Sequence, residues 1–199
     1  MSPGLKVTME MTQTKETVRN MMRQRRADLD AGWVQTASRR VVERVVALPE
    51  FKRAEVICTY LSLPGEVQTK PILEAAWKAG KRVSVAALRD DGEYMPAWIT
   101  PDEPLMTAKF GVRQPATLHW AKPDRYDLVI VPGLAFSVTG GRMGHGRGFY
   151  DRMLARLAAR LTCRAGVCFG FQLVPDLPVT EHDGGMDVIV TEDAVIRTT

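Results

Sequence analysis

Glycines gather in one short stretch of the chain, TGGRMGHGRGFYDR, together with arginines and an aspartate. Five of the 16 glycines fall between Gly140 and Gly148. Because glycine has no side chain, successive backbone N–H groups can point into one concavity and approach an anion closely. A helix that begins directly after the loop would add the positive end of its dipole. The stretch therefore predicts a binding site for phosphate groups.

The charged residues of this stretch suit the same chemistry. Arg142 and Arg147 flank or enter the loop, where guanidinium groups can neutralise phosphate, Arg147 by a bidentate contact. Asp151 would lie in the first turn of the next helix, where it could hold Mg²⁺ against the phosphate oxygens. The residue order matches neither G-x-x-x-x-G-K-S/T nor G-x-G-x-x-G. A flexible turn with a capping aspartate is the alternative, but the expected strand, loop and helix favour phosphate binding.

Strands and helices that alternate along the chain must position this loop. Short β-branched runs predict strands at residues 55–61, 82–88, 127–132, 164–170 and 187–191. Helical periodicity predicts helices at residues 15–29, 33–48, 71–79 and 150–161, the second of them ended by Pro49. Such alternation predicts an α/β fold with a mostly parallel twisted sheet covered on both faces. Ligands of these sheets bind at the carboxyl ends of the strands.

The composition is that of an ordinary globular chain, with 199 residues, 45% hydrophobic and 25% charged. Its length fits a single domain, expected over residues 15–199 after a flexible extension at residues 1–14. The sequence contains neither a stretch of the ~20 apolar residues that span a bilayer nor a secretory signal, so we expect a cytoplasmic protein. Cys58, Cys163 and Cys168 lack zinc-ligand spacing and are expected as buried free thiols.

Positive charge is concentrated near the start of the chain. Ten Lys or Arg and five Asp or Glu lie between Lys15 and Arg53, and Arg19, Arg23 and Arg26 recur along one helical stripe. The simplest interpretation of the stripe is a solvated face, and an RNA-associated protein is another. The net charge of +4 is modest for a nucleic-acid binder, and no interleaved aromatic platform accompanies the arginines. Nucleic acid is therefore not an expected partner.

The stretch VPGLAFSVTGGRMGHGRGFYDRML, residues 131–154, resembles the signature of the 5-formyltetrahydrofolate cyclo-ligase family, also called 5,10-methenyltetrahydrofolate synthetases. That signature is roughly PGLAFD-x-x-G-x-R-L-G-x-G-x-G-x-YD. Further blocks agree in order, namely RQRRADL, ALPEFKRA, YLSLPGEVQT, FGVRQP, GVCFGFQLV and LPVTEHDGGMDVIVTE. The resemblance covers about residues 15–193. It implies a single three-layer α/β/α domain of the Rossmann-like kind, and we expect a monomer without membrane partners.

The resemblance also implies a reaction, the ATP- and Mg²⁺-dependent cyclisation of 5-formyltetrahydrofolate to 5,10-methenyltetrahydrofolate with release of ADP and phosphate. In the family, ATP phosphorylates the formyl oxygen and nitrogen 10 of the folate attacks the activated carbon, after which phosphate leaves. Catalysis would then consist largely of positioning and charge neutralisation.

Carried over residue by residue, the resemblance implies a set of roles. Lys15 and Arg147 would be catalytic, with Arg147 gripping the transferred phosphoryl group. ATP would contact Lys15, Arg19, Arg142, Met143, Gly144, His145, Gly146, Arg147, Gly148, Phe149 and Tyr150. Folate would contact Leu61, Glu66, Phe110, His145, Gly146, Arg147, Gly148 and Phe149, with Phe110 stacking on its ring system. Asp151 and Asp187 would hold Mg²⁺.

The chain departs from the family pattern at Ser137, where the family usually has Asp, and His145 stands at a variable loop position. The Ser137 change affects one polar contact expected to support the loop. An alternative function is a non-catalytic folate- or nucleotide-binding module on the same scaffold. Retention of Asp151, Asp187, Lys15 and Arg147 favours the enzyme.

Overall fold

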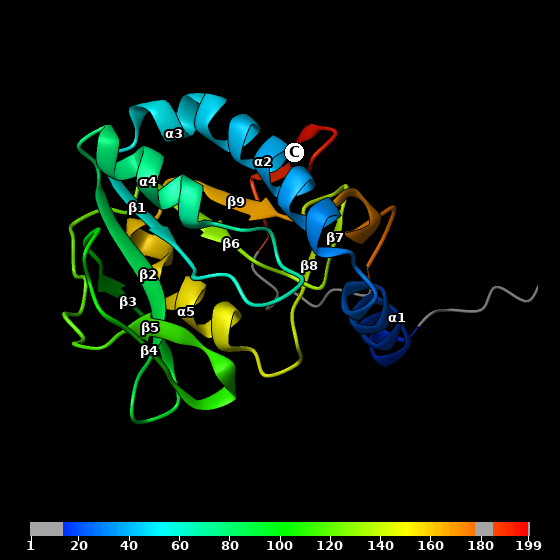
Figure 1. Ribbon diagram of the computed structural model, residues 1–199, viewed down its shortest axis with the longest axis horizontal. Coiled ribbons are helices and arrows are strands. Elements are labelled where there is room, and N and C mark those ends of the chain that lie inside the picture. Colours follow the sequence, from blue (N-terminus) through cyan, green and yellow to red (C-terminus); the bar gives the residue numbers. More distant parts are fainter. Residues whose placement is uncertain (1–13, 178–184, 199) are drawn as a thin grey trace, which may run out of the picture.

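A seven-stranded sheet runs through the middle of the protein (Figure 1). The computed structural model describes residues 14–177 and 185–198, so the predicted extension lies outside the described residues except for Thr14. The strand order is β12-β11-β9-β6-β1-β2-β3. The strands are β1 (Val56–Thr59), β2 (Arg82–Leu88), β3 (Tyr94–Trp98), β6 (Leu128–Val131), β9 (Arg164–Val167), β11 (Val188–Val190) and β12 (Val195–Arg197). The five inner strands are parallel and the two edge strands antiparallel, which confirms the mostly parallel sheet.

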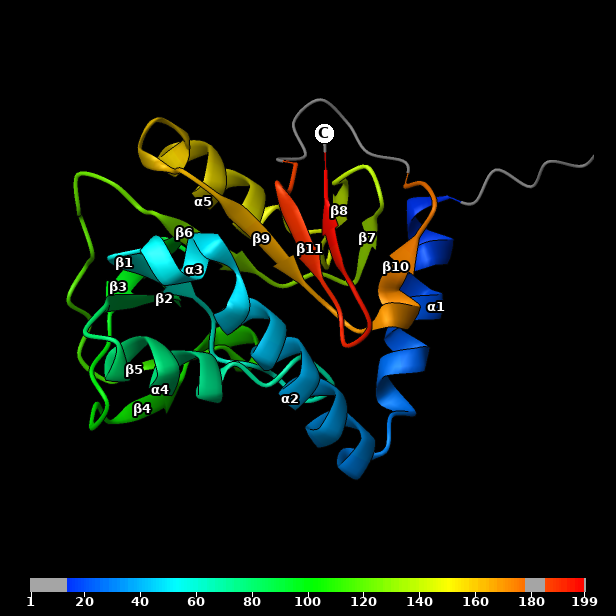
Figure 2. The same ribbon diagram turned by 90° about the horizontal axis from the view of Figure 1, so that it is seen from above.

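Helices cover both faces of this sheet, and the sequence of β1 explains why. Successive side chains of a strand point to opposite faces. Ile57 packs with α2 (Ala31–Ala47), α3 (Pro49–Arg53) and α4 (Lys70–Lys78), whereas Val56 and Cys58 pack on the side of α5 (Phe149–Leu157). Figure 2 shows α5 on one side of the sheet and α2, α3 and α4 on the other. The predicted three-layer α/β/α arrangement is confirmed.

Helix boundaries follow local capping signals. The side chain of Thr14 accepts a hydrogen bond from the Thr17 amide at the start of α1 (Lys15–Ala27), and Asp30 does the same for Trp33 in α2. The expectation that Pro49 only ends a helix was incomplete, because Pro49 also begins α3, where its missing N–H costs nothing. Helix α5 ends at Leu157, and a 3₁₀ turn (Ala158–Arg160) completes the predicted helical stretch.

Two small β-structures were not predicted from the sequence. The first is a three-stranded sheet in the order β10-β7-β8, formed by β7 (Ala135–Ser137), β8 (Arg142–Met143) and β10 (Leu173–Val174). The second is a hairpin of β4 (Leu105–Thr107) and β5 (Arg113–Pro115). The sequence predicted that the glycine-rich stretch follows β6 directly, but β7 lies between them, and the stretch itself contains β8 before it leads into α5.

Helix α1 packs against the small sheet rather than against the central one. Val18 and Met22 contact a cluster that contains Leu134, Met143 and Leu177. This packing brings the basic stripe of α1 to the glycine-rich loop that follows β8.

Two composition-based expectations concern the whole chain. All three cysteines are buried free thiols, as predicted. Within residues 14–177 and 185–198, no helix combines the length and the apolar character that crossing a membrane requires.

Candidate functional site

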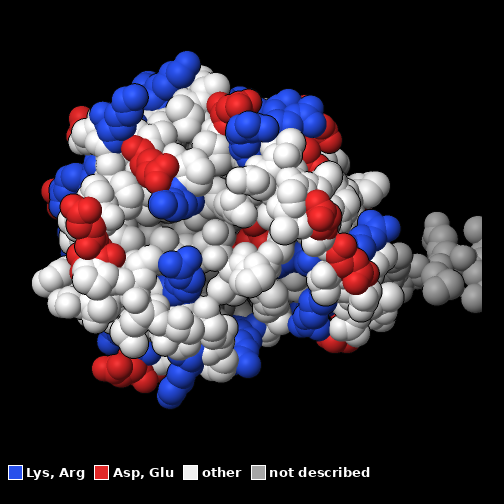
Figure 3. Space-filling view, viewed as in Figure 1, with Lys and Arg blue, Asp and Glu red and all other residues white. Residues whose placement is uncertain are grey.

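A pocket of about 240 Å³ opens beyond the carboxyl ends of β1 and β6. Its wall is formed by the segment after β1, by the β4–β5 hairpin, and by the glycine-rich loop with the first turn of α5. Figure 3 shows the same face as Figure 1, with basic and acidic side chains interspersed over it. The pocket lies where parallel sheets bind their ligands.

The glycine-rich loop delivers an open helix terminus to this pocket. Gly146 and Gly148 have φ of 99° and 65°, left-handed values that favour glycine. Gly148 is the N-cap of α5, and no side chain of the described residues caps the first backbone N–H groups of that helix. Uncapped N–H groups at the positive end of a helix attract an anion. The predicted phosphate site therefore has a structural basis at the start of α5.

Arg142 organises the base of the loop. Its side chain is 3% exposed, and its Nη2 donates to the Asp151 carboxylate while Nη1 donates to the Pro132 carbonyl at 3.3 Å. The guanidinium also lies 5.6 Å from the centre of the Tyr150 ring. These contacts tie the end of β6 to the first turn of α5 and fix the orientation of Asp151.

Aromatic rings form a second part of the pocket, and Arg147 lies against them. The Arg147 guanidinium is 3.8 Å from the centre of the Phe110 ring. The Phe110 and Phe149 rings are 5.9 Å apart, and Phe149 lies 4.9 Å from Tyr94. Phe110 is 53% exposed and has a φ of 63°, which is unusual for a residue with a Cβ. Such a wall suits a planar heterocycle.

Glu66 is a buried carboxylate in the same pocket. Its side chain is 9% exposed, Oε2 accepts from the Leu63 amide at 3.0 Å, and Oε1 lies 3.3 Å from Nη2 of Arg26. Burial raises the pKa of Glu66, and the Arg26 guanidinium opposes this shift. Leu61, also predicted to contact folate, lines the pocket nearby.

His145 faces the pocket from the loop. Desolvation, together with the guanidinium groups of Arg26, Arg23 and Arg142, lowers the pKa of His145 to about 4. The imidazole is therefore neutral at pH 7 and supplies no positive charge to phosphate.

Helix α1 holds the loop from behind. Arg19 Nε donates to the Gly144 carbonyl at 3.3 Å, and Arg23 Nη2 donates to the His145 carbonyl at 3.3 Å. Lys15 lies one turn before Arg19 on the same face of α1. The basic stripe is thus a contact surface for the loop, although the Arg23 side chain also remains exposed to solvent. Sequence reasoning missed Arg23 and Arg26, although their spacing from Arg19 placed them on this stripe.

The predicted residues separate into two groups. Those that line the pocket are Leu61, Glu66, Phe110, Arg142, Gly144, His145, Arg147, Gly148, Phe149, Tyr150 and Asp151. Lys15, Arg19 and Gly146 lie outside this lining, and Met143 is buried in the cluster beneath α1.

Asp187 lies away from the pocket, at the amino ends of the parallel strands. It directly precedes β11, and its Oδ2 accepts from the Arg164 amide at 2.6 Å, at the amino end of β9. Asp151 lies at the pocket, beyond the carboxyl ends of the strands. The described structure therefore does not bring Asp151 and Asp187 together as a magnesium site. Among the residues that it describes, no cluster of three or more His, Cys, Asp or Glu is suited to a metal.

Comparison with known proteins places this geometry in a family. Residues 11–192 match the model of the 5-formyltetrahydrofolate cyclo-ligase family. The chain is 32% identical to the 5-formyltetrahydrofolate cyclo-ligase of Escherichia coli K12 over 179 residues, covering 88% of this chain and 98% of that one. A probable 5-formyltetrahydrofolate cyclo-ligase of Schizosaccharomyces pombe is 32% identical over 172 residues, covering 79% and 84%.

A solved structure agrees with this result. The NMR structure of 5,10-methenyltetrahydrofolate synthetase from Aquifex aeolicus superimposes with a TM-score of 0.79 at 29% identity, covering 93% of each chain. The match to the family model spans nearly all of the described residues, including the pocket, the glycine-rich loop and α1. The chain belongs to the 5-formyltetrahydrofolate cyclo-ligase family.

Proposed function

We propose that the chain catalyses the ATP- and Mg²⁺-dependent cyclisation of 5-formyltetrahydrofolate to 5,10-methenyltetrahydrofolate, with release of ADP and phosphate. One observation carries the proposal. The uncapped start of α5 and the aromatic wall with Glu66 belong to one pocket, so an anion and a planar heterocycle can meet there. The relatives named above are cyclo-ligases for this substrate.

Folate binding is assigned to the aromatic side of the pocket. Phe110 and Phe149 would stack on the fused ring system, and Leu61 would supply apolar contact beside it. Glu66 would accept hydrogen bonds from N–H groups of the heterocycle. This orientation would place the formyl group toward the glycine-rich loop.

ATP binding is assigned to the glycine-rich loop and α1. The phosphates would occupy the start of α5, where no side chain within residues 14–177 and 185–198 caps the backbone N–H groups of the first turn. Arg19 would keep the loop in place, and Lys15 would approach the phosphates from the same helix.

The chemistry proceeds in two steps. First, the formyl oxygen attacks the γ-phosphorus and the bond to ADP breaks. Nitrogen 10 then attacks the formyl carbon and loses its proton, and the C–O bond breaks so that inorganic phosphate leaves. Arg147 and Lys15 would neutralise the charge on the transferred phosphoryl group. Neither step requires a nucleophilic side chain.

A divalent cation fits at Asp151 but not at Asp187. Asp151 Oδ1 binds Arg142, while Oδ2 lies on the side of Gly148, where a Cβ added to that glycine would be 4.0 Å away. Mg²⁺ is commonly held by one or two carboxylates together with substrate phosphates. Asp151 would hold Mg²⁺ in this way, and the ion would neutralise phosphate charge when bound.

The proposal is tested by following the near-ultraviolet absorbance of 5,10-methenyltetrahydrofolate. We expect formation from 5-formyltetrahydrofolate only when ATP and Mg²⁺ are both present. Arg147→Gln should lower kcat on the order of a hundredfold, because charge on the phosphoryl group loses its partner. Arg156→Gln, an exposed arginine of α5 that pairs with Glu93, is the matched control and should retain activity.

Absence of product from folded protein would contradict the proposal. Titration calorimetry with 5-formyltetrahydrofolate and with ATP would then detect the alternative, a non-catalytic folate- or nucleotide-binding module.

A further inference from the structure

The last turn of α1 reaches the folate side of the pocket through one arginine. Arg26 Nη2 contacts Oε1 of Glu66 and donates to the Pro64 carbonyl, both at 3.3 Å. The side chains of Arg26 and Glu66 are each 9% exposed. Gly65 lies close to the backbone of Arg26, and a Cβ at Gly65 would be 3.0 Å from the Arg26 carbonyl oxygen, so a larger residue would push the two segments apart. The ion pair is therefore largely shielded from solvent.

The burial of the Arg26 guanidinium is not explained by a gain in fold stability. Arg26 Nη1 is buried and has no hydrogen-bond partner within the described residues. A buried N–H group without an acceptor costs free energy, and so does desolvation of both charged groups of the pair. Features with such a cost are found at functional sites.

Glu66 keeps acceptor capacity for a ligand after its contacts within the protein. An ionised carboxylate offers about four lone-pair positions. The Arg26 contact and the Leu63 amide take one on each oxygen, so one position remains on each. Two neighbouring acceptors match the adjacent amino and ring N–H donors of a pterin-type heterocycle. Only the ionised form provides both acceptors.

We propose that Arg26 is a positioning residue, which fixes the orientation and the negative charge of Glu66 for folate recognition. The inference rests on the proposed function for its ligand, and Arg26 itself does not touch the folate in this assignment. It adds a role for the third arginine of the stripe. Arg19 and Arg23 bind the carbonyls of the glycine-rich loop, whereas Arg26 binds the folate-facing segment.

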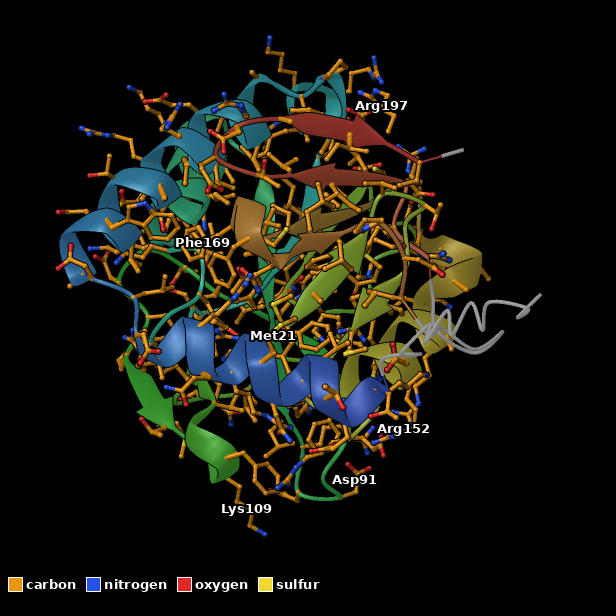
Figure 4. The ribbon with its side chains drawn as sticks, turned by 90° about the vertical axis from the view of Figure 1, so that its right-hand side faces the viewer. Met21, Asp91, Lys109, Arg152, Phe169 and Arg197 are labelled. Carbon is orange, nitrogen blue, oxygen red and sulfur yellow. The ribbon has the colours of Figure 1, made fainter. Side chains whose placement is uncertain are left out.

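Through these three arginines, α1 contacts segments on both sides of the pocket. Arginines at positions i, i+4 and i+7 share one helix face. In Figure 4, α1, marked by Met21, crosses the side of the molecule that faces the viewer. Movement of α1 would shift the glycine-rich loop and Glu66 together.

The ionisation of Glu66 depends on groups from every element around it. Burial raises the pKa of Glu66, and Arg26 is the first charge that lowers it. The other titratable or charged groups of the pocket are Tyr60, Tyr94, Arg113, Arg142, His145, Arg147, Tyr150 and Asp151. Burial raises the pKa of Tyr94 to about 12 and raises those of Tyr60 and Tyr150, so the tyrosines are neutral near pH 7. Loss of the Arg26 charge should therefore raise the pKa of Glu66 further.

Binding of 5-formyltetrahydrofolate, measured by titration calorimetry without ATP from pH 5.5 to 8.5, tests the proposal. We expect Arg26→Gln to weaken binding at pH 7 about tenfold, which corresponds to about 1.4 kcal/mol. Affinity should fall as pH decreases, with a midpoint above that of the unchanged protein, because protonated Glu66 loses one acceptor. Arg26→Lys should return the midpoint toward its original value.

Two comparisons separate positioning from a general structural effect. Arg25→Gln removes the same charge from an exposed neighbour on α1 and should leave affinity and its pH profile unchanged. In a Glu66→Gln background, Arg26→Gln should weaken binding little further. Additive losses in the double variant, or a pH profile of Arg26→Gln equal to that of the unchanged protein, would overturn the proposal. The proposed function fails separately, if the unchanged protein binds folate but forms no product with ATP and Mg²⁺.

Discussion

The hydroxyl of Ser137 closes the turn that leads into the glycine-rich loop. Ser137 is 1% exposed, and its Oγ accepts from the Gly141 amide at 2.9 Å and pairs with the Thr139 hydroxyl at 2.8 Å. The family signature has a carboxylate at this position. The hydroxyl makes these contacts without burying a charge, which would carry a desolvation cost. Ser137 thus supports the turn before the loop through its hydroxyl.

The two aspartates assigned to Mg²⁺ should behave differently when changed. We expect Asp151→Asn to raise the Mg²⁺ concentration for half-maximal activity roughly tenfold or more, because a charged oxygen beside the phosphates is lost. Asp187→Asn should leave this concentration unchanged. Initial rates of product formation over a Mg²⁺ titration, at saturating ATP and folate, measure both.

Asp187 is expected to contribute to the free energy of unfolding and not to Mg²⁺ binding. Asp187→Ala removes the acceptor of the Arg164 amide and should lower the free energy of unfolding by about 1 kcal/mol. A shift in Mg²⁺ dependence on changing Asp187 would contradict the separation of the two sites and restore Asp187 as a ligand.

How much of the site is predictable from sequence depends on the kind of contact. Arg142, Arg147 and Asp151 stand in one segment, so their types and spacing indicate phosphate chemistry directly. Arg26 and Glu66 are 40 residues apart, and only the fold makes them an ion pair. For Asp187 the motif suggested a metal ligand, but the fold separates this residue from the pocket. Asp187 directly precedes β11 and so lies at the amino ends of the parallel strands, whereas the pocket lies beyond their carboxyl ends.

At the level of elements, the β4–β5 hairpin brings Phe110 to the pocket. Phe110 lies at the tip, with a left-handed φ of 63°, and its ring faces the Arg147 guanidinium. A left-handed residue other than glycine costs on the order of 1 kcal/mol, with asparagine among the better tolerated types. The tip therefore holds a strained backbone and an exposed aromatic ring at the site assigned to folate.

Phe110→Asn should separate stability from binding. The change relieves part of the backbone strain and removes an exposed ring, so we expect the free energy of unfolding to change by less than about 1 kcal/mol. The KM for 5-formyltetrahydrofolate should rise about tenfold as stacking is lost. Denaturant unfolding and steady-state kinetics give the two values.

Phe110→Tyr retains the ring and is the matched control, expected to keep a KM close to that of the unchanged protein. Equal KM values for Phe110→Asn and Phe110→Tyr would show that the ring does not bind folate.

The elements that the sequence predicts are those buried on both faces. Each of the five inner strands forms within a predicted β-branched run, because a strand covered by helices on both sides must be apolar throughout. The edge strand β3 was missed since Pro96 lies inside it, and proline is tolerated only where an N–H partner is not needed. The hairpins were missed because their strands have two or three residues each and carry no periodic pattern.

For the molecule as a whole, the three layers and α1 differ in how firmly they are held. Helices α2 to α5 pack on the central sheet, whereas α1 buries Val18 and Met22 against the small cluster, with Met21 partly buried beside them, and adds its arginine contacts. Segments with few buried apolar contacts open at lower free energy than the core.

Hydrogen exchange should report this difference. We expect amides of α1 to exchange faster than those of β1 and β6 in the free protein, and to slow when ATP and 5-formyltetrahydrofolate are added together. The ligands slow exchange because they bind the loop and the Glu66 segment that α1 holds. Mass-resolved exchange of peptides covering residues 14–27 and 56–59 measures it, and equal protection of both in the free protein would contradict the expectation.

The packing of α1 also sets an order of events during synthesis. The partners of Val18 and Met22, which are Leu134, Met143 and Leu177, are made more than a hundred residues after them. A nascent chain can therefore assemble α2, α4 and the first strands while α1 still lacks its docking surface. Helix α1 therefore docks only after these distant partners have been made, and the glycine-rich loop gains the support of α1 at that point.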